Sequence, residues 1–265
     1  MNKILNISLL FLIITLFPLP AALAETPEEK GLVITQEAER RDTGFKDATF
    51  SLIMTLRNRH GQESTRRIRM KVLEVVGDGD KSLAIFDNPG DVKGTAFLNY
   101  THKAGDDDQW LYLPALKRVK RISSRNKSGS FMGSEYSYED LSSQEVEKYT
   151  YTWIRDEVYD GRDCFVVERY PVDSKNSGYK RQLSWIDKKE YRTWKVEYYD
   201  KKGSHLKTLT FAGYRQYLDR YWRPDHMKMV NHLNGKSTDL EFSDYQFRVG
   251  LKENDFSKNA LKRAK

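Results

Sequence analysis

Apolar and polar residues alternate in short runs along most of the chain. In residues 49–56 the apolar positions are Phe50, Leu52, Met54 and Leu56. Because residues two apart in a strand share a face, this run predicts a half-buried β-strand. Residues 66–76 return with Ile68 and Met70 on one face and cations on the other, after a polar stretch at 58–62 that favours a hairpin turn.

The same pattern continues to the C-terminal end. Turn dipeptides such as Asp160-Gly161 and Asn234-Gly235 separate the runs, and such dipeptides are strong hairpin signals. The further strands expected are 81–86, 95–100, 109–113, 149–154, 164–170, 180–186, 193–199, 206–214, 222–231 and 236–247.

Helical patterns are scarce. Residues 26–41 predict an N-terminal helix whose buried side contains Leu32, Ile34 and Ala38, and residues 138–147 predict a second, short helix. A sheet of about twelve strands curls rather than staying flat. We therefore expect an all-β dominated fold, with few helices, in which a strongly curved antiparallel sheet forms an incomplete barrel and a helix packs in its concave side.

The N-terminal residues predict export from the cytoplasm. A positive start at Met1-Asn2-Lys3, an apolar stretch at 4–20 and the small residues of Ala22-Leu23-Ala24 have the layout of a cleavable secretory signal. The alternative is an uncleaved membrane anchor. No cysteine adjoins the expected cut, so we expect a periplasmic protein that is not lipidated. No linker divides residues 25–265, which predicts a single domain.

Composition narrows the choice of partners and chemistry. The net charge of +7 is a balance of 45 basic and 38 acidic residues, and an exported chain is not expected to bind nucleic acid. The single cysteine, Cys164, allows no internal disulfide and lies in an apolar run, which predicts a buried side chain. The five histidines are scattered, and we find no nucleophile elbow, phosphate loop or calcium loop. We expect no catalytic residue, metal or cofactor.

Two segments carry more information. Residues 116–127 are rich in cations that cannot be buried unpaired: Lys117, Arg118, Lys120 and Arg121. They predict either an edge strand protected by its charges or a docking surface for an anionic partner or membrane. Residues 128–138 hold Phe131, Met132 and Tyr136 between glycines and serines without a regular period. They predict a gate over an apolar cavity, or a plug in the core.

Several stretches resemble the LolA-like family of periplasmic outer-membrane lipoprotein-sorting proteins, in the longer branch associated with RND/MMPL-type exporters. They are residues 87–95 (DNPGDVKGT), 110–119 (WLYLPALKRV), 129–134 (GSFMGS) and 242–245 (FSDY). The resemblance implies an incomplete barrel with an α-helical lid over an apolar cavity. It also implies that the protein carries lipid or lipoprotein acyl chains between membranes as a monomer, with an inner-membrane exporter and transient contact with a membrane surface.

The residues expected to line such a cavity are Phe50, Leu52, Met54, Leu56, Ile68, Met70, Leu83, Ile85, Phe97 and Trp110. Each of them is equally compatible with an ordinary filled core. Two other functions remain open: a periplasmic module that binds a non-lipid ligand such as a glycan, and a hydrolase whose site has no recognisable motif.

Overall fold

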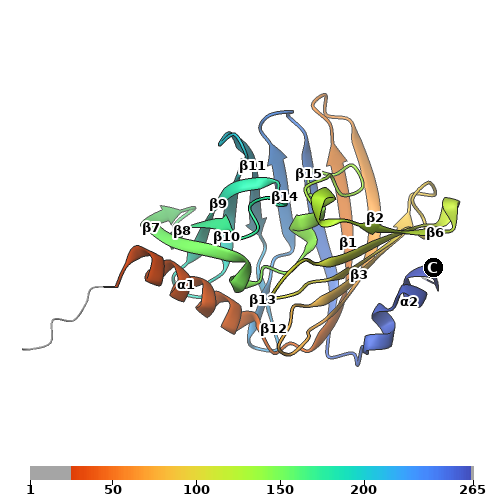
Figure 1. Ribbon diagram of the computed structural model, residues 1–265, viewed down its shortest axis with the longest axis horizontal. Helices are drawn as coiled ribbons and strands as arrows, with labels where there is room; N and C mark the ends of the chain where they lie inside the picture. The colour runs from red at the N-terminus through yellow and green to blue at the C-terminus, as the bar shows by residue number, and fades with distance from the viewer. Residues whose placement is uncertain (1–24, 264–265) are drawn as a thin grey trace, which may run out of the picture.

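A computed structural model describes residues 25–263 (Figure 1). The expected signal at residues 1–24 lies outside the described residues and stays a prediction. The main sheet has 13 antiparallel strands. They are β1 (Asp47–Arg57), β2 (Glu63–Leu73), β3 (Lys81–Asn88), β4 (Ala96–Tyr100), β5 (Asp108–Leu113), β6 (Arg118–Ile122), β7 (Tyr149–Tyr159), β8 (Arg162–Pro171), β9 (Tyr179–Asp187), β10 (Thr193–Asp200), β11 (His205–Ala212), β14 (His226–Asn231) and β15 (Ser237–Phe247).

Most neighbours in the sheet are also neighbours in the chain. The strand order is β6-β5-β4-β3-β2-β1-β15-β14-β11-β10-β9-β8-β7, so the chain runs outward from β1 to one edge, crosses to β7 at the other edge, and returns to pair β15 with β1. The two edge strands do not pair with each other, so the barrel is incomplete as predicted. A small hairpin of β12 (Arg215–Tyr217) and β13 (Tyr221–Arg223) forms a separate two-stranded sheet.

The curved sheet has an inner and an outer face. We call the inner face the one on which Leu52 and Ile68 lie side by side in the central cluster. The segment between β6 and β7 crosses this face, in green in Figure 1, between the two halves of the sheet. The C-terminal helix α2 (Lys258–Arg263) follows the short 3-10 helix η5 (Glu253–Phe256) and packs outside β4 and β5.

The predicted N-terminal helix is present as α1 (Pro27–Asp42). Thr26 caps it: its hydroxyl accepts from the Glu29 amide at 3.1 Å, and the Glu29 carboxylate accepts from the Thr26 amide at 2.9 Å. The helix packs on β7 along Gly31 and Ile34, and a Cβ on Gly31 would lie only 2.7 Å from the Trp153 amide nitrogen.

The buried side of α1 differs from the prediction at one position. The side of α1 that faces the sheet contains the buried residues Gly31 and Ile34. Leu32 points away from that side toward solvent and is 38% exposed. None of the helices in residues 25–263 is long and apolar enough to cross a membrane.

Two other local predictions need correction. The helix expected at 138–147 is two 3-10 helices, η3 (Tyr138–Leu141) and η4 (Val146–Lys148), because Ser142 has extended angles of φ −82° and ψ 148° that end the first one. The cationic strand is shorter than expected. β6 lies between the 3-10 helices η1 (Pro114–Leu116) and η2 (Ser124–Asn126), and Lys117 has a positive φ of 48°.

Candidate functional site

The inner face carries one large apolar cluster. It joins strands from both halves of the sheet, and it contains six of the residues expected to line a cavity. Four of these are buried and two are partly buried: Leu52, Met54, Ile68 and Phe97, then Leu56 and Met70. Val196, Leu209 and Met229 extend the cluster across the second half of the sheet.

Three expected cavity residues lie on the outer face instead. Leu83, Ile85 and Trp110 pack with Phe256 and Leu261 beneath the C-terminal segment. In β3 the inward positions are Ala84 and Phe86. The run Leu-Ala-Ile-Phe is apolar at every position, so its sequence pattern does not tell which face is inner. Phe50 stands apart from the central cluster: its ring stacks on Tyr245 at 4.7 Å and tilts against Phe242 at 5.9 Å.

Residues 128–142, which we call the plug, cover the inner face. They form a small hairpin in which Ser130 bridges to Ser137 and the Phe131 amide donates to the Tyr136 carbonyl at 2.7 Å. Met132 and Gly133 occupy its tip with positive φ angles of 50° and 79°. The expected gate residues thus lie together on one hairpin.

The plug is packed into the central cluster. Phe131 and Tyr136 are each 2% exposed, and Met132 is partly buried against the same cluster. The ring centroid of Phe131 lies 5.2 Å from that of Phe97 and 5.9 Å from that of Phe86. In this conformation the plug fills the hollow of the sheet, which is one of the two alternatives the sequence left open.

A buried polar network fastens the plug to the second half of the sheet. Lys207 of β11 donates to a carboxylate oxygen of Asp140 at 2.7 Å and to the carbonyl of Glu135 at 2.8 Å. The Tyr179 hydroxyl of β9 donates to the same Asp140 carboxylate at 2.8 Å. Burial raises the pKa of Tyr179 well above its usual value, and the charge of Asp140 adds to the effect, so this hydroxyl stays a donor.

Further contacts hold the tip and base of the plug. Arg66 of β2 donates to the Met132 carbonyl, and Asn231 donates to the Glu135 carboxylate at 2.7 Å. Glu139 accepts from the Gly178 amide at 2.9 Å, and burial with the neighbouring Asp140 charge raises the pKa of Glu139 to about 7. The Tyr136 hydroxyl is buried without a hydrogen-bond partner among the described residues. The plug is thus held by both halves of the sheet.

Sequence reasoning missed this polar network. One face of β11 carries Lys207, Leu209 and Phe211, and the last two belong to the apolar central cluster. A lysine at an otherwise apolar, inward-facing position was the sequence feature that could have indicated a buried charge. Its partner Asp140 lies 67 residues away in the chain, in an irregular segment whose course no periodicity predicts.

A pocket of about 250 Å³ opens beside the plug. It reaches Gly133 and Glu135 of the plug, and its other walls come from the β1–β2 hairpin and the start of β15: Leu56, Arg57, Asn58, Gln62, Glu63, Ser64, Lys236, Ser237 and Thr238. A second pocket, between β6 and the base of the plug, holds about 10 Å³. Sites for small molecules usually measure about 300 Å³ or more and are largely apolar. At about 250 Å³, the pocket beside the plug is smaller than this range.

The cationic segment lies at the edge of the sheet. Four cations are exposed on or next to β6, which within the described residues 25–263 pairs with β5 alone: Lys117, Arg118, Lys120 and Arg121. Within residues 25–263, Arg121 alone of the four has an ion-pair partner, Asp108 at 2.5 Å. The structure therefore brings together an open strand edge and three free cations.

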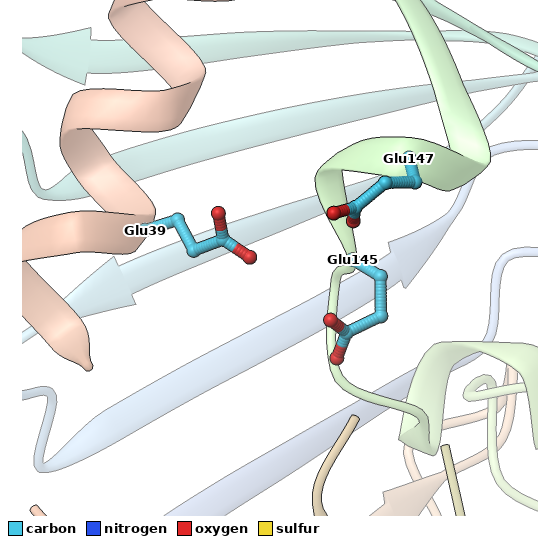
Figure 2. Close-up of side chains that lie close together, drawn as sticks. All are labelled: Glu39, Glu145 and Glu147. Atoms are coloured by element: carbon cyan, nitrogen blue, oxygen red, sulfur yellow. The ribbon is translucent and has the colours of Figure 1, made fainter. Parts of the chain in front are cut away.

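Three glutamates gather near the C-terminal end of α1 (Figure 2). Glu39 points from the helix toward Glu145 and Glu147 of the segment before β7, and their carboxylate oxygens lie within 4.8 Å of one another. The ammonium of Lys103 is 3.9 Å from Glu39 and 3.7 Å from Glu147. Because a lysine already supplies positive charge here, the cluster acts as an ionic contact between α1 and η4.

The sole cysteine is buried as expected. Cys164 is 0% exposed in an outer cluster with Val166 and Trp185, and burial raises the pKa of its thiol. A protonated thiol without access to solvent is a poor nucleophile.

Comparison with known proteins identifies the fold and the family. A family model described as "Uncharacterized protein" matches residues 78–263, and no curated protein matches the chain. Among solved structures, a domain described as an outer-membrane lipoprotein-sorting protein from Vibrio parahaemolyticus has 61% identity and a TM-score of 0.87, over 89% of this chain and 100% of that one. A DUF1329 family protein from Desulfovibrio piger has 32% identity and a TM-score of 0.84, over 89% and 99%.

A more distant structure shows the fold alone. The LolA superfamily protein of Nitrosomonas europaea is 21% identical with a TM-score of 0.70, over 87% of this chain and 98% of that one. The large curved open sheet, with one N-terminal helix packed on it, is thus the LolA-like fold expected from the resemblance. With this fold and with 61% and 32% identity over nearly nine tenths of its length, the chain belongs to the DUF1329 family of outer-membrane lipoprotein-sorting-like domains.

Proposed function

We propose that this protein is a non-enzymatic periplasmic carrier that binds acyl chains of a lipid or lipoprotein on the inner face of its sheet. The acyl chain takes the place of the plug. The Vibrio parahaemolyticus relative named for outer-membrane lipoprotein sorting supports this function, and so does the chemistry of the inner face.

One observation carries the proposal: an apolar sheet face is covered by a plug that, within residues 25–263, pairs with no strand of the sheet. The backbone hydrogen bonds of Phe131 and Ser134 stay within the plug, and contacts with side chains of the sheet hold the plug in place. The plug can therefore leave without breaking a strand ladder, at a lower cost than a strand. The apolar area that it uncovers suits hydrocarbon, since each methylene removed from water contributes about 0.8 kcal/mol.

Met and aromatic side chains on this face suit a cargo that must also be released. Met54, Met70 and Met229 lie in or against the central cluster. Their flexible thioether chains adapt to different ligand shapes without specifying one. This composition favours a carrier for acyl chains over a module for a polar ligand such as a glycan.

The exposed cations of β6 are our candidate docking surface for an inner-membrane exporter of the RND/MMPL type. Lys117, Arg118 and Lys120 stand next to an unpaired strand edge and have no ion-pair partner within residues 25–263. An anionic strand or loop of a partner would complement both the charge and the open hydrogen-bonding edge.

Hydrogen exchange during ligand titration tests the exchange of plug for cargo. The amide of Glu135 donates to the Thr238 hydroxyl of β15 at 3.0 Å, so this bond exists only while the plug is docked. Binding of dodecanol should speed the exchange of the Glu135 amide while the amides of β1 and β2 keep their protection. Binding that leaves the Glu135 amide protected would refute the displacement, and failure of every acyl probe to bind would refute the carrier function.

A further inference from the structure

Lys207 is a buried cation whose acceptors all belong to the plug. Its side chain is 4% exposed and that of Asp140 is 5% exposed. The hydrogen bonds of its ammonium in residues 25–263 go to the Asp140 carboxylate and the Glu135 carbonyl, both plug groups. The ammonium also makes cation–π contacts with the rings of Tyr179 and Tyr198, whose centroids lie 5.1 and 5.2 Å away.

Neighbouring sheet groups around Lys207 are donors as well. The Tyr179 hydroxyl donates to Asp140 at 2.8 Å, and the Asn231 amide donates to the Glu135 carboxylate at 2.7 Å. At this point of the sheet, Lys207, Tyr179 and Asn231 therefore present donors and a positive charge to acceptors of the plug.

This polarity restricts what can replace the plug. Withdrawal of Asp140 and Glu135 would leave the Lys207 ammonium on an apolar floor without an acceptor. Burying a charge without a counter-ion is strongly unfavourable, and removing one partner of a buried pair is among the most destabilising changes in proteins. A neutral hydrocarbon would cover the apolar surface but would leave the Lys207 charge unpaired. An alkyl chain with an anionic head group would cover the apolar surface and pair with the charge.

We propose that Lys207 and the Tyr179 hydroxyl form a head-group site for an amphiphile that carries a carboxylate or a phosphate. In the plugged state the Asp140 carboxylate occupies this site, and Phe131 with Tyr136 occupies the position of the chain. This inference rests on the proposed function, because the site becomes available only when the plug leaves the inner face.

Three probes with the same alkyl chain test the site: dodecanoate, dodecyl phosphate and dodecanol. The variant is the double substitution Lys207→Met with Asp140→Asn, because removing both charges avoids a stranded carboxylate and keeps the protein folded. Lys202→Met, in the exposed turn between β10 and β11, is the matched control that loses one positive charge elsewhere.

The wild-type protein should bind at least one anionic probe more tightly than dodecanol. The double variant should lose about 10- to 100-fold of the preference for that probe over dodecanol, which corresponds to about 1.4 to 2.8 kcal/mol. The ratio of the two affinities is the readout, because loosening of the plug changes the affinity for both probes by the same factor. The control should behave as wild type. Preference between dodecanoate and dodecyl phosphate then tells whether the natural head group is a carboxylate or a phosphate.

The remaining outcomes separate the two proposals. If wild type binds all three probes equally, or if the double variant keeps the preference for anionic probes, the head-group site is refuted and the carrier function stands. Competition by inorganic phosphate or acetate at the concentration of the probes would show an anion site without a chain and would refute an amphiphile. If no probe binds to wild type, the carrier function is refuted and the head-group site with it.

Discussion

Replacing Phe131 by alanine should weaken the docked plug and strengthen ligand binding at the same time. The Phe131 ring is 2% exposed and packs against three aromatic rings, those of Phe86, Phe97 and Tyr138, with centroids 5.2 to 5.9 Å away. Truncating a buried phenylalanine to alanine costs about 3 to 5 kcal/mol. In Phe131→Ala, the substitution destabilises the conformation with the plug docked and leaves the conformation with the plug withdrawn almost unchanged.

A ligand that must displace the plug binds with an affinity reduced by the fraction of molecules whose plug has left. Destabilising the docked plug by about 3 kcal/mol raises this fraction, and the affinity for an acyl probe should rise by up to about 100-fold. Dodecanol is the suitable probe, since its neutral head group does not depend on Lys207.

Phe256→Ala is the matched control. Phe256 is 0% exposed but lies on the outer face with Leu83 and Trp110. It should lose a similar free energy of unfolding in a urea titration without any gain in dodecanol affinity. Unchanged affinity in Phe131→Ala, or an equal gain in both variants, would refute the reasoning that the plug competes with the ligand.

Three further predictions concern other parts of the molecule. Met132→Asp should also loosen the docked plug, because a carboxylate replaces a side chain packed against the central cluster, and the affinity for dodecanol should rise without unfolding of the protein; unchanged affinity would contradict the role of the plug tip. Charge reversal at Arg118 and Lys120 should reduce binding to anionic vesicles or to an exporter domain more than it reduces acyl binding, and equal losses would argue against a separate docking surface. Burial and the Asp140 charge raise the pKa of Glu139 from 4.5 to about 7, so the folded protein holds a proton that the unfolded chain releases. That stabilisation is complete below about pH 4.5 and is lost as the pH rises through 7; Glu139→Gln should flatten this part of the unfolding profile, and an unaltered profile would show that Glu139 does not contribute.

Local patterns in the sequence determined the strands and the first helix. Alternation predicted β1 and β2, with Leu52 opposite Ile68 on one face, because the side chains of a strand point to two sides in turn. The capping residues Thr26 and Glu29 and the helical run after them determined where α1 begins. The charges of 117–121 determined that this segment is exposed, since unpaired cations are not buried.

Only the tertiary structure decided which face of each strand is inner and what fills the hollow. In Leu83–Phe86 every residue is apolar, so the curvature of the whole sheet decided that Ala84 and Phe86 point inward. The ion pair of Lys207 with Asp140 joins a regular strand to an irregular loop across 67 residues. This contact depends on how the curvature of the sheet places its two edge strands, β6 and β7, which the plug segment connects. Hydrophobic periodicity describes only residues close together in the chain, so it does not predict such a contact.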